Sequence, residues 1–497
     1  MWPPSHLVAD EVTRLSNSTA LLAALLLAGC AVGPDYHRPG TTVPAQWKAG
    51  SPWKEAQPMD TAMKENWWEI YDDPVLSGLE TMAATNSPDA RAALARVDQA
   101  RAVARISRAD LFPDLRLAPT ANRERFPKSR PIQPDAIAGA QNYTVNDFRV
   151  PLDLSYEVDL WGRLRRSFRS AREQAQASAA AYQTVLLSLQ AEIAQTYFTI
   201  RSFDLERRVV GESVELRKKN QALVKSLHDG GGGSALDVAR AETELASAQA
   251  DLVNLKLRRD QLENSVAVLC GQQVFHFSIV ESTRRYRPPV IPGALPSDLL
   301  ERRPDVAQAE RTMAAASEQI GVAKAAFFPS IRLTGFAGVE SADLKTLFNW
   351  ESREWSFGPS ISLPLFEGGR NRAGLDRAKA AYDEATAQYR LRVLVAFREV
   401  DDALNGLNLL KERFDDELRA VESAQKAAEL SRIRYKGGLA SYFEVVDAER
   451  TFLNTEILAY EVNGERMVTS VVLIKALGGG WKPDVAYQTG TVVERPR

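Results

Sequence analysis

Two very long stretches of helical periodicity constrain the fold of this chain more than any other feature. No proline occurs between Arg163 and Asp229, and apolar residues recur there at spacings of three and four. A continuous helix over this range would be roughly 100 Å long, which a compact globular domain does not accommodate. The same spacing returns from Leu375 to Phe414. We therefore predict two coiled-coil-like helices of unusual length.

Each long stretch ends at glycines, Gly230–Gly233 in the first case and Gly437-Gly438 in the second. Glycine is favoured just past a helix C-terminus because it adopts left-handed backbone conformations. A shorter helical stretch follows each glycine turn and is expected to return antiparallel. The two turns are thus predicted to be the tips of helical hairpins.

The unit that contains each hairpin occurs twice in the sequence. ADLFPDLRL at residues 109–117 matches AAFFPSIRL at residues 325–333, with an offset of 216. Later matches share an offset of 207, as GGGSALDV at 231–238 does with GLASYFEV at 438–445. A constant offset over the long later segment indicates a duplicated unit of helix, two strands, very long helix and returning helix.

Alternating apolar residues predict the strands. Every second residue from Phe148 to Leu160 is apolar, and the pattern returns from Trp355 to Leu365. Weaker alternation follows the two Phe-Pro motifs, at residues 114–117 and 331–340. Each half of the chain therefore contributes two strands, which makes four in total.

Two interpretations of these strands remain open on the pattern alone. One is a half-exposed sheet on a soluble protein, and the other is a membrane β-barrel with an apolar outer face. A membrane sheet cannot leave its edges unpaired, and four strands are too few to close a barrel. If the strands lie in a membrane, several chains must share one barrel.

The N-terminal segment has the features of an export signal. A short apolar run at residues 19–28 leads into Leu-Ala-Gly-Cys at Leu27–Cys30, which resembles the bacterial lipoprotein box. This resemblance implies cleavage before Cys30 and covalent lipid on its sulfur, and Ala31 resembles lipoproteins that are sent to the outer membrane. The alternative is an ordinary signal with a chance cysteine.

These features divide the chain into six segments. They are a lipoprotein signal peptide (1–29), a lipidated N-terminal segment (30–63), a first repeat (64–272), a proline-rich connector (273–303), a second repeat (304–480) and a C-terminal tail (481–497).

Composition excludes several classes of protein. The 62 basic and 64 acidic residues give a net charge of −2, which argues against a nucleic-acid partner. Two cysteines and four histidines leave little material for a disulfide scaffold, a metal site or histidine-based catalysis. No constellation of nucleophile and base is visible, so we expect neither an enzyme nor a cofactor apart from the lipid on Cys30.

Several motifs together resemble one family, the TolC-type outer-membrane efflux channels of the OprM/NodT lipoprotein branch. The matching stretches are CAVGPDYHRP (30–39), WWEIYDDPVL (67–76), LPSDLLERRPDVAQAE (295–310), the two Phe-Pro motifs and RYKGGLASYFEVVDAER (434–450). The resemblance covers nearly the whole mature chain.

The resemblance implies an α+β membrane protein that forms a homotrimer. Its twelve-strand barrel lies in outer-membrane lipid and its coiled-coil helices form a twelve-helix periplasmic α-barrel. It further implies a duct that conducts drugs or other small toxic compounds passively out of a Gram-negative cell. The implied partners are a periplasmic adaptor (a membrane fusion protein) and an inner-membrane RND transporter.

The family closes its tunnel at the helical tips, and the resemblance carries this gate to four residues here. The acidic constriction matches Glu444 and Asp447, and the gating network matches Tyr435 and Asp237. Three copies of an acidic side chain around a narrow axis form a ring that attracts cations. Ala440 stands where some relatives carry a basic residue that locks the gate. The alternative for each carboxylate is a solvated position on a helix surface.

Two other functions compete with the efflux duct. One is an outer-membrane channel of type I protein secretion, and the other is a lipid-anchored periplasmic coiled-coil scaffold without a pore. The sequence identifies neither the exported substrate nor the particular pump and adaptor.

Overall fold

The computed structural model describes residues 31–37, 66–127, 143–291 and 303–479. The signal peptide, Cys30 and the predicted C-terminal tail lie outside these residues, as do most of the predicted N-terminal segment and the end of the predicted connector. None of the helices in the described part of the chain combines the length and the apolar composition that crossing a membrane requires.

The chain divides into two units that each draw on both sequence repeats. One unit contains residues 1–39, 98–175 and 310–387, and the other contains residues 40–97, 176–309 and 388–497. The first unit holds the β-strands, and the second holds both helical hairpin tips. Four helices contribute residues to both units.

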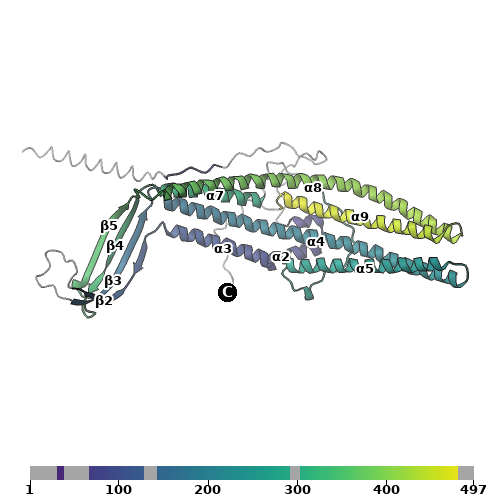
Figure 1. Cartoon of the computed structure of the whole chain (residues 1–497), viewed down its shortest axis with the longest axis horizontal. Coiled ribbons are helices and arrows are strands. Elements are labelled where there is room, and N and C mark those ends of the chain that lie inside the picture. The colour runs from purple at the N-terminus through teal and green to yellow at the C-terminus, as the bar shows by residue number, and fades with distance from the viewer. Residues whose placement is uncertain (1–30, 38–65, 128–142, 292–302, 480–497) are drawn as a thin grey trace, which may run out of the picture. The chain divides into compact units, whose positions relative to one another are not determined.

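The helices repeat with the spacing that the sequence predicted (Figure 1). The two longest, α4 and α8, have 67 residues each, and the returning helices α5 and α9 have 35 each. A shorter pair, α3 and α7, has 22 residues each. The bounds are α3 Pro88–Ala109, α4 Arg163–Asp229, α5 Ala235–Leu269, α7 Pro304–Ala325, α8 Arg370–Lys436 and α9 Tyr442–Ala476. Each predicted long helix is therefore continuous.

The strands form a single antiparallel sheet (Figure 1). The order is β1-β3-β4-β5, and β2 also pairs with β3 beyond the end of β1. The bounds are β1 Asp114–Leu117, β2 Thr120–Phe126, β3 Tyr143–Val158, β4 Ser330–Ser341 and β5 Arg353–Ser362, with the short helix η3 at Trp350–Ser352 before β5. The described part of the chain is thus mostly helical, with one antiparallel sheet.

The sequence predicted the number of strand positions correctly but not their bounds. The first position is divided into β1 and β2, because Pro119 lies between them and has no N–H to donate. β3 begins at Tyr143, five residues before the predicted alternation begins at Phe148, and β5 ends at Ser362, before Pro364. Prolines explain the break and the early end, since neither can join the ladder of hydrogen bonds.

The register confirms that the alternating apolar residues share one face of the sheet. Leu115 pairs with Leu154 across β1 and β3, and Leu333 pairs with Pro359 across β4 and β5. The opposite face carries the charges, where Arg149 Nε lies 2.6 Å from a Glu354 carboxylate oxygen. The sheet therefore has one apolar and one polar face.

Near the start of the second unit, an aromatic cluster packs against α4. The short helix η1 (Trp67–Tyr71) buries its aromatic side chains, and the ring centroid of Tyr71 lies 4.7 Å from that of Phe198 on α4, with the two rings tilted at 53°. The next helix, α2 (Pro74–Asn86), begins with Asp73, whose carboxylate accepts hydrogen bonds from two backbone N–H groups of its first turn. The tryptophans of the WWEIYDDPVL motif therefore serve packing.

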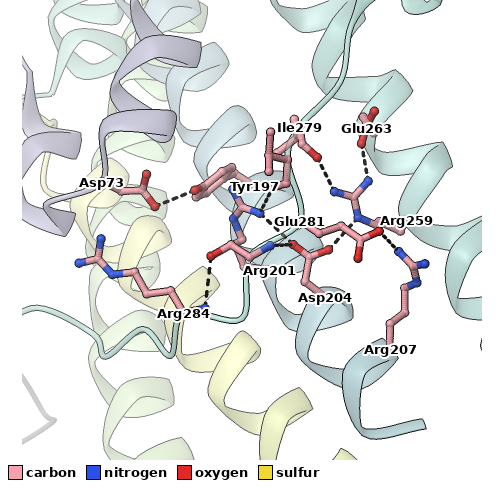
Figure 2. Close-up of polar contacts among 12 residues, drawn as sticks. Asp73, Tyr197, Arg201, Asp204, Arg207, Arg259, Glu263, Ile279, Glu281 and Arg284 are labelled. Carbon is pink, nitrogen blue, oxygen red and sulfur yellow. Dashed lines mark hydrogen bonds and ion pairs between the residues drawn. The ribbon is translucent and has the colours of Figure 1, made fainter. Parts of the chain in front are cut away.

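Asp73 also belongs to a buried polar cluster (Figure 2). Its Oδ2 accepts hydrogen bonds from the hydroxyl of Tyr197 at 2.6 Å and from that of Tyr286 at 2.5 Å. Burial alone would raise the pKa of Asp73, but these two hydrogen bonds and two from backbone N–H groups outweigh it, so that the pKa is lowered. Asp73 thereby ties Tyr286, in the predicted connector, to α4.

A second carboxylate, Asp204 of α4, completes this cluster (Figure 2). Its carboxylate oxygens lie 2.8 Å from Nη1 of Arg201 and 2.7 Å from Nε of Arg259 on α5. Both arginines are buried. The two guanidinium groups also donate to the backbone carbonyls of Val280 and Ile279 in the connector. The connector, which includes the short helix η2 (Val274–His276), is thus held to α4 and α5 by buried, paired charges.

Candidate functional site at the hairpin tips

The two helical hairpins end in turns of the same construction. Residues 230–234 join α4 to α5, and residues 437–441 join α8 to α9. Gly231 and Gly438 have φ angles of 81° and 71°, in the left-handed region that favours glycine. In each turn, the next backbone N–H donates to a carbonyl five residues earlier, at 2.9 and 2.8 Å. The predicted tips are therefore equivalent glycine-capped helix ends.

The first turn has an additional reason for glycine at Gly233. A Cβ atom at this position would lie 2.7 Å from the backbone nitrogen of His228, closer than packing allows. The equivalent residue in the second turn is Ala440, where a side chain is present. The first tip is therefore the more tightly folded of the two at this position.

An apolar cluster joins the two hairpins just behind the turns. Its buried members are Val224 of α4, Ala241 of α5, and Tyr442 and Val445 of α9. Tyr435 of α8 packs against this cluster, with its ring centroid 5.7 Å from that of Tyr442. All four hairpin helices therefore meet in one contact.

Two of the four predicted gate residues lie together at this cluster. Burial, and then the negative charge of the nearby Asp237, raises the pKa of the Tyr435 hydroxyl. Asp237 itself, in the first turn of α5, lies 3.8 Å from Arg240. The structure thus brings Tyr435 of the second hairpin close to Asp237 of the first.

The other two predicted residues are on the exposed side of α9. The Glu444 carboxylate lies 3.6 Å from Arg434 and accepts the backbone N–H of Ser441 at 3.4 Å, so it caps its own helix. Asp447 is exposed, and no residue in the described part of the chain pairs with its carboxylate. Of the predicted acidic pair, Asp447 is the carboxylate with a free charge.

Sequence reasoning missed a buried ion pair at Glu244 of α5. Its side chain is 12% exposed and lies 2.9 Å from Nη1 of Arg217 on α4. Arg450 of α9 forms a second ion pair with the same carboxylate. Glu244 therefore links its own hairpin to the other one.

A similar arrangement surrounds Glu449 of α9, which sequence reasoning also missed. Its carboxylate accepts a hydrogen bond from Arg432 of α8 at 2.7 Å and one from Asn220 of α4 at 3.1 Å. Burial, followed by the charge of Glu449, raises the pKa of the adjacent Tyr442 to about 12. Arg432 is 38% exposed, so Glu449 is the buried member of this ion pair, and the hydrogen bond from Asn220 is its contact with the other hairpin.

Helical spacing contained a signal for both glutamates. Each one continues a stripe of side chains that faces the neighbouring helices, at spacings of three and four. The stripes are Ala241, Glu244 and Ala248 on α5, and Tyr442, Val445 and Glu449 on α9. A charged residue on such a stripe predicts a paired carboxylate, because an unpaired one would be costly to bury.

The tips offer non-covalent contacts between helices and charged side chains. Among the described residues, no group of three or more His, Cys, Asp or Glu side chains is arranged to hold a metal ion. The arrangement offers closely packed aromatic rings, the ion pair of Arg450 with Glu244 between hairpins and the exposed carboxylate of Asp447. Such a site can hold two hairpins together and set the charge at the end of a passage.

An antiparallel sheet with one apolar face, joined to two long helical hairpins, defines this chain as an outer-membrane channel protein. Solved structures share this fold. The outer-membrane channel OprN matches with a TM-score of 0.83 and 32% identity, over 91% of this chain and all of that one. The Campylobacter jejuni CmeC outer membrane channel matches with a TM-score of 0.84 and 26% identity, over 91% and 96%.

The chain belongs to the outer membrane efflux protein family, whose profile matches residues 79–272 and 295–479. Among its relatives, outer membrane protein OprJ of Pseudomonas aeruginosa is 35% identical over 93% of this chain and 95% of its own. The solvent efflux pump outer membrane protein SrpC of Pseudomonas putida is 33% identical, over 94% of this chain and 98% of its own.

These matches confirm the predicted family, location and general role. The protein lies in the outer membrane and is the exit duct of an efflux system. Its family consists of channels and not of enzymes. The family match favours the efflux duct over a secretion channel and over a scaffold without a pore.

Proposed function

We propose that three copies of this chain form one duct and share a closed barrel of twelve strands in the outer membrane. Their long helices form a twelve-helix tunnel in the periplasm. A sheet with four strand positions, whose two edges are unpaired among the described strands, supports this assembly, since membrane sheets must close. Lipid on Cys30 anchors each chain to the outer membrane.

The proposed cargo is small toxic compounds, including drugs and organic solvents. The names of several relatives support this class: SrpC is a solvent efflux pump protein, TtgI a toluene efflux pump protein and OpmQ a pyoverdine export protein. The duct conducts passively and receives its cargo from an inner-membrane RND transporter through a periplasmic adaptor.

The hairpin tips are the proposed gate of the duct. The observation that carries this proposal is that few contacts hold the two hairpins together there. They include the apolar cluster around Tyr442, the ion pair of Arg450 with Glu244 and the hydrogen bond that Asn220 donates to Glu449. Because each contact joins helices of different hairpins, opening the gate requires breaking them. The ion pair of Arg450 with Glu244 supplies the restraint that a basic residue at the Ala440 position gives in some relatives.

Charge at the closed gate comes from the exposed acidic side chains. Three copies of Asp447 contribute unpaired carboxylates, and three copies of Asp237 and Glu444 contribute carboxylates with a nearby arginine. A ring of such carboxylates attracts cations and repels anions. We therefore assign cation preference mainly to Asp447 and mechanical closure mainly to Glu449 and Glu244.

Single-channel conductance in lipid bilayers tests both assignments. Glu449→Ala should raise the open probability about tenfold or more, because it removes the hydrogen bond from Asn220 that joins the two hairpins, hydrogen bonds to charged groups contribute about 1.5–3 kcal/mol and 1.4 kcal/mol is a factor of 10. Asp447→Ala should lower cation preference and leave the open probability unchanged. Glu242→Ala is the matched control, since Glu242 is exposed and is the repeat equivalent of Glu449.

Specific outcomes would contradict the gate. If the Glu449→Ala and Glu244→Ala channels open no more often than the Glu242→Ala channel, the tips are not held by the contacts of these two glutamates. If Asp447→Ala keeps the original cation preference, Asp447 does not belong to the gate. Silence of the unmodified protein in the bilayer, with adaptor or without, would contradict the duct itself.

A further inference from the structure

A buried arginine at the start of α4 holds the N-terminal segment of the chain. The Arg166 side chain is only 2% exposed, and it lies in the same unit as residues 31–37. Its Nη1 donates to the backbone carbonyl of Pro34 at 3.1 Å and to Glu318 of α7 at 3.0 Å. Nη2 lies 3.8 Å from the exposed carboxylate of Asp35.

Two glycines allow the segment to approach this arginine closely. Gly33 has a φ angle of 133°, and a Cβ atom there would lie 2.7 Å from the Cα of Gly321 on α7. A Cβ atom on Gly321 would collide with the side chain of Arg166. Any side chain at Gly33 or Gly321 would therefore displace the segment or the arginine.

Contacts on both sides of Arg166 fix the ends of the segment. The Val32 N–H donates to the carbonyl of Trp161 at 3.1 Å, and the Tyr36 hydroxyl donates to Glu310 of α7 at 3.4 Å. Ala31 lies beside Gly162: a Cβ atom added to Gly162 would lie 3.0 Å from the Cβ atom of Ala31. Ala31 is thus held in the short link between β3 and α4.

The site occurs once in a chain that is otherwise duplicated. The repeat equivalent of Arg166 is Ala373, at an offset of 207, and that of Gly321 is Arg105, at an offset of 216. Neither the buried cation nor the glycine is repeated. The duplication therefore does not account for the site around Arg166. The N-terminal segment that contacts this site is likewise present only once in the chain.

Loss of the segment would leave the arginine underpaired. Arginine remains charged at any pH relevant to proteins, and Nε of Arg166 already lacks a partner among the described residues. Without Pro34 and Asp35, only the Glu318 ion pair would remain for a nearly buried guanidinium. Such a group is costly to bury, so the site favours the bound segment.

We propose that α4 and α7 form a binding site for residues 31–36, centred on Arg166, that fixes where the lipid anchor is attached. The inference rests on the proposed lipidation of Cys30, the residue before Ala31. An acyl chain attached there is tethered at the junction where the sheet ends and α4 begins. Arg166 is a positioning residue for the anchor and takes no part in conduction.

Hydrogen–deuterium exchange of the lipidated full-length protein in detergent tests the binding site. Arg166→Leu and Gly33→Val should each speed exchange in the peptide that covers residues 31–37 by about tenfold or more, because the Val32 N–H loses protection. Arg169→Leu is the matched control, since Arg169 is exposed three residues further along α4. Gly33→Val leaves both helices unchanged, so it tests the site even if Arg166→Leu fails to fold.

A Cys30→Ala protein separates the site from the anchor. Residues 31–37 should stay protected in it, and unchanged exchange in both Arg166→Leu and Gly33→Val would overturn the proposal. Loss of protection in Cys30→Ala alone would assign the restraint to lipid and would also overturn it. Intact mass of the N-terminal peptide reports acylation independently, so a missing lipid is recognised as failure of the lipidation proposal.

A fluorescence measurement tests the placement of the anchor. A bimane attached at His37→Cys, an exposed position, can be quenched by nitroxide-labelled lipid in vesicles that contain the lipidated protein. Adding Gly33→Val should change this quenching at least about twofold, because the released segment samples other depths. Equal quenching with and without Gly33→Val would show that the site does not position the anchor.

Discussion

The side chain of Glu206 on α4 is buried beside another acidic residue. It is 2% exposed, and Ser202 donates a hydrogen bond to it at 3.1 Å. Burial, with a further contribution from the charge of Glu461, raises the pKa of Glu206 to about 7, while Ser202 and Arg258 act in the opposite direction. Glu206 therefore changes its charge close to neutral pH.

This raised pKa makes the stability of the protein depend on pH. The folded state binds the proton more tightly than the unfolded state, so the stabilisation is complete below about pH 4.5 and is lost as the pH rises through about 7. The shift corresponds to about 3 kcal/mol. Glu206→Gln should remove this contribution, and the unfolding temperature of the variant should fall less than that of the original protein between pH 5 and 8.

Thermal unfolding in detergent across this pH range measures the difference between the two curves. Glu212→Gln is the control, because Glu212 lies on the same helix but is exposed. Parallel curves for Glu206→Gln and the original protein would show that Glu206 does not titrate in this range.

For single residues at the tips, the sequence predicted some of the contacts and missed others. Tyr435 and Asp237 could be placed together because the family resemblance assigns both of them to the gate, one at each tip. Glu244 and Glu449 were missed because a carboxylate on a helix is usually solvated, and only the identity of its partners shows otherwise. Those partners, Arg217 and Asn220, lie 13 and 10 residues before Gly230, so their approach depends on how α4 packs against α5 and α9.

Among the elements, strand β4 depends on a glycine at its centre. A Cβ atom at Gly338 would lie 2.5 Å from the carbonyl oxygen of Val150 and 2.8 Å from the Cα of Pro151 in β3. Both atoms belong to the backbone of the neighbouring strand and cannot rotate away. Gly338 therefore permits the close approach of β3 and β4 next to a proline that donates no hydrogen bond.

Gly338→Ala should accordingly disrupt the pairing of β3 with β4. We expect less folded protein in the outer membrane and a lower unfolding temperature, by an amount typical of overpacking, about 1–3 kcal/mol. Gly358→Ala provides a control in the same sheet, because no atom lies within 4 Å of the added Cβ there. Equal loss in the two variants would point to glycine flexibility and not to the contact with β3.

Periodicity predicted elements better than it predicted their ends. The long helices α4 and α8 follow from proline-free stretches with one apolar stripe, and the matching bounds of their repeats follow from the offset of 207. β2, beyond Pro119, was missed because residues 120–126 show no alternation of apolar residues, whereas the early end of β5 was missed because Leu363 and Leu365 continue the alternation on both sides of Pro364. A strand ends there because proline has no backbone N–H to donate, and the alternation of apolar and polar side chains does not show where this happens.

For the whole molecule, the edges of the sheet set the main constraint. β5 pairs only with β4 among the described strands, and β1 and β2 pair only with β3. Each unpaired backbone group in hydrocarbon costs several kcal/mol, and membrane barrels begin at about eight strands. One chain alone therefore cannot satisfy its sheet in a bilayer, whereas two or more copies can close a barrel.

The trimer predicts a definite mass for the detergent-solubilised protein. Native mass spectrometry should give about three times the mass of one mature chain, because three four-strand sheets form the proposed twelve-strand barrel. The Cys30→Ala protein should give the same multiple, since strand pairing and not lipid holds the copies together. A dimer would contradict the proposed number of copies but retain a shared barrel of eight strands. A monomer that stays folded and soluble without detergent would contradict the membrane barrel, because its sheet edges would then be satisfied by water.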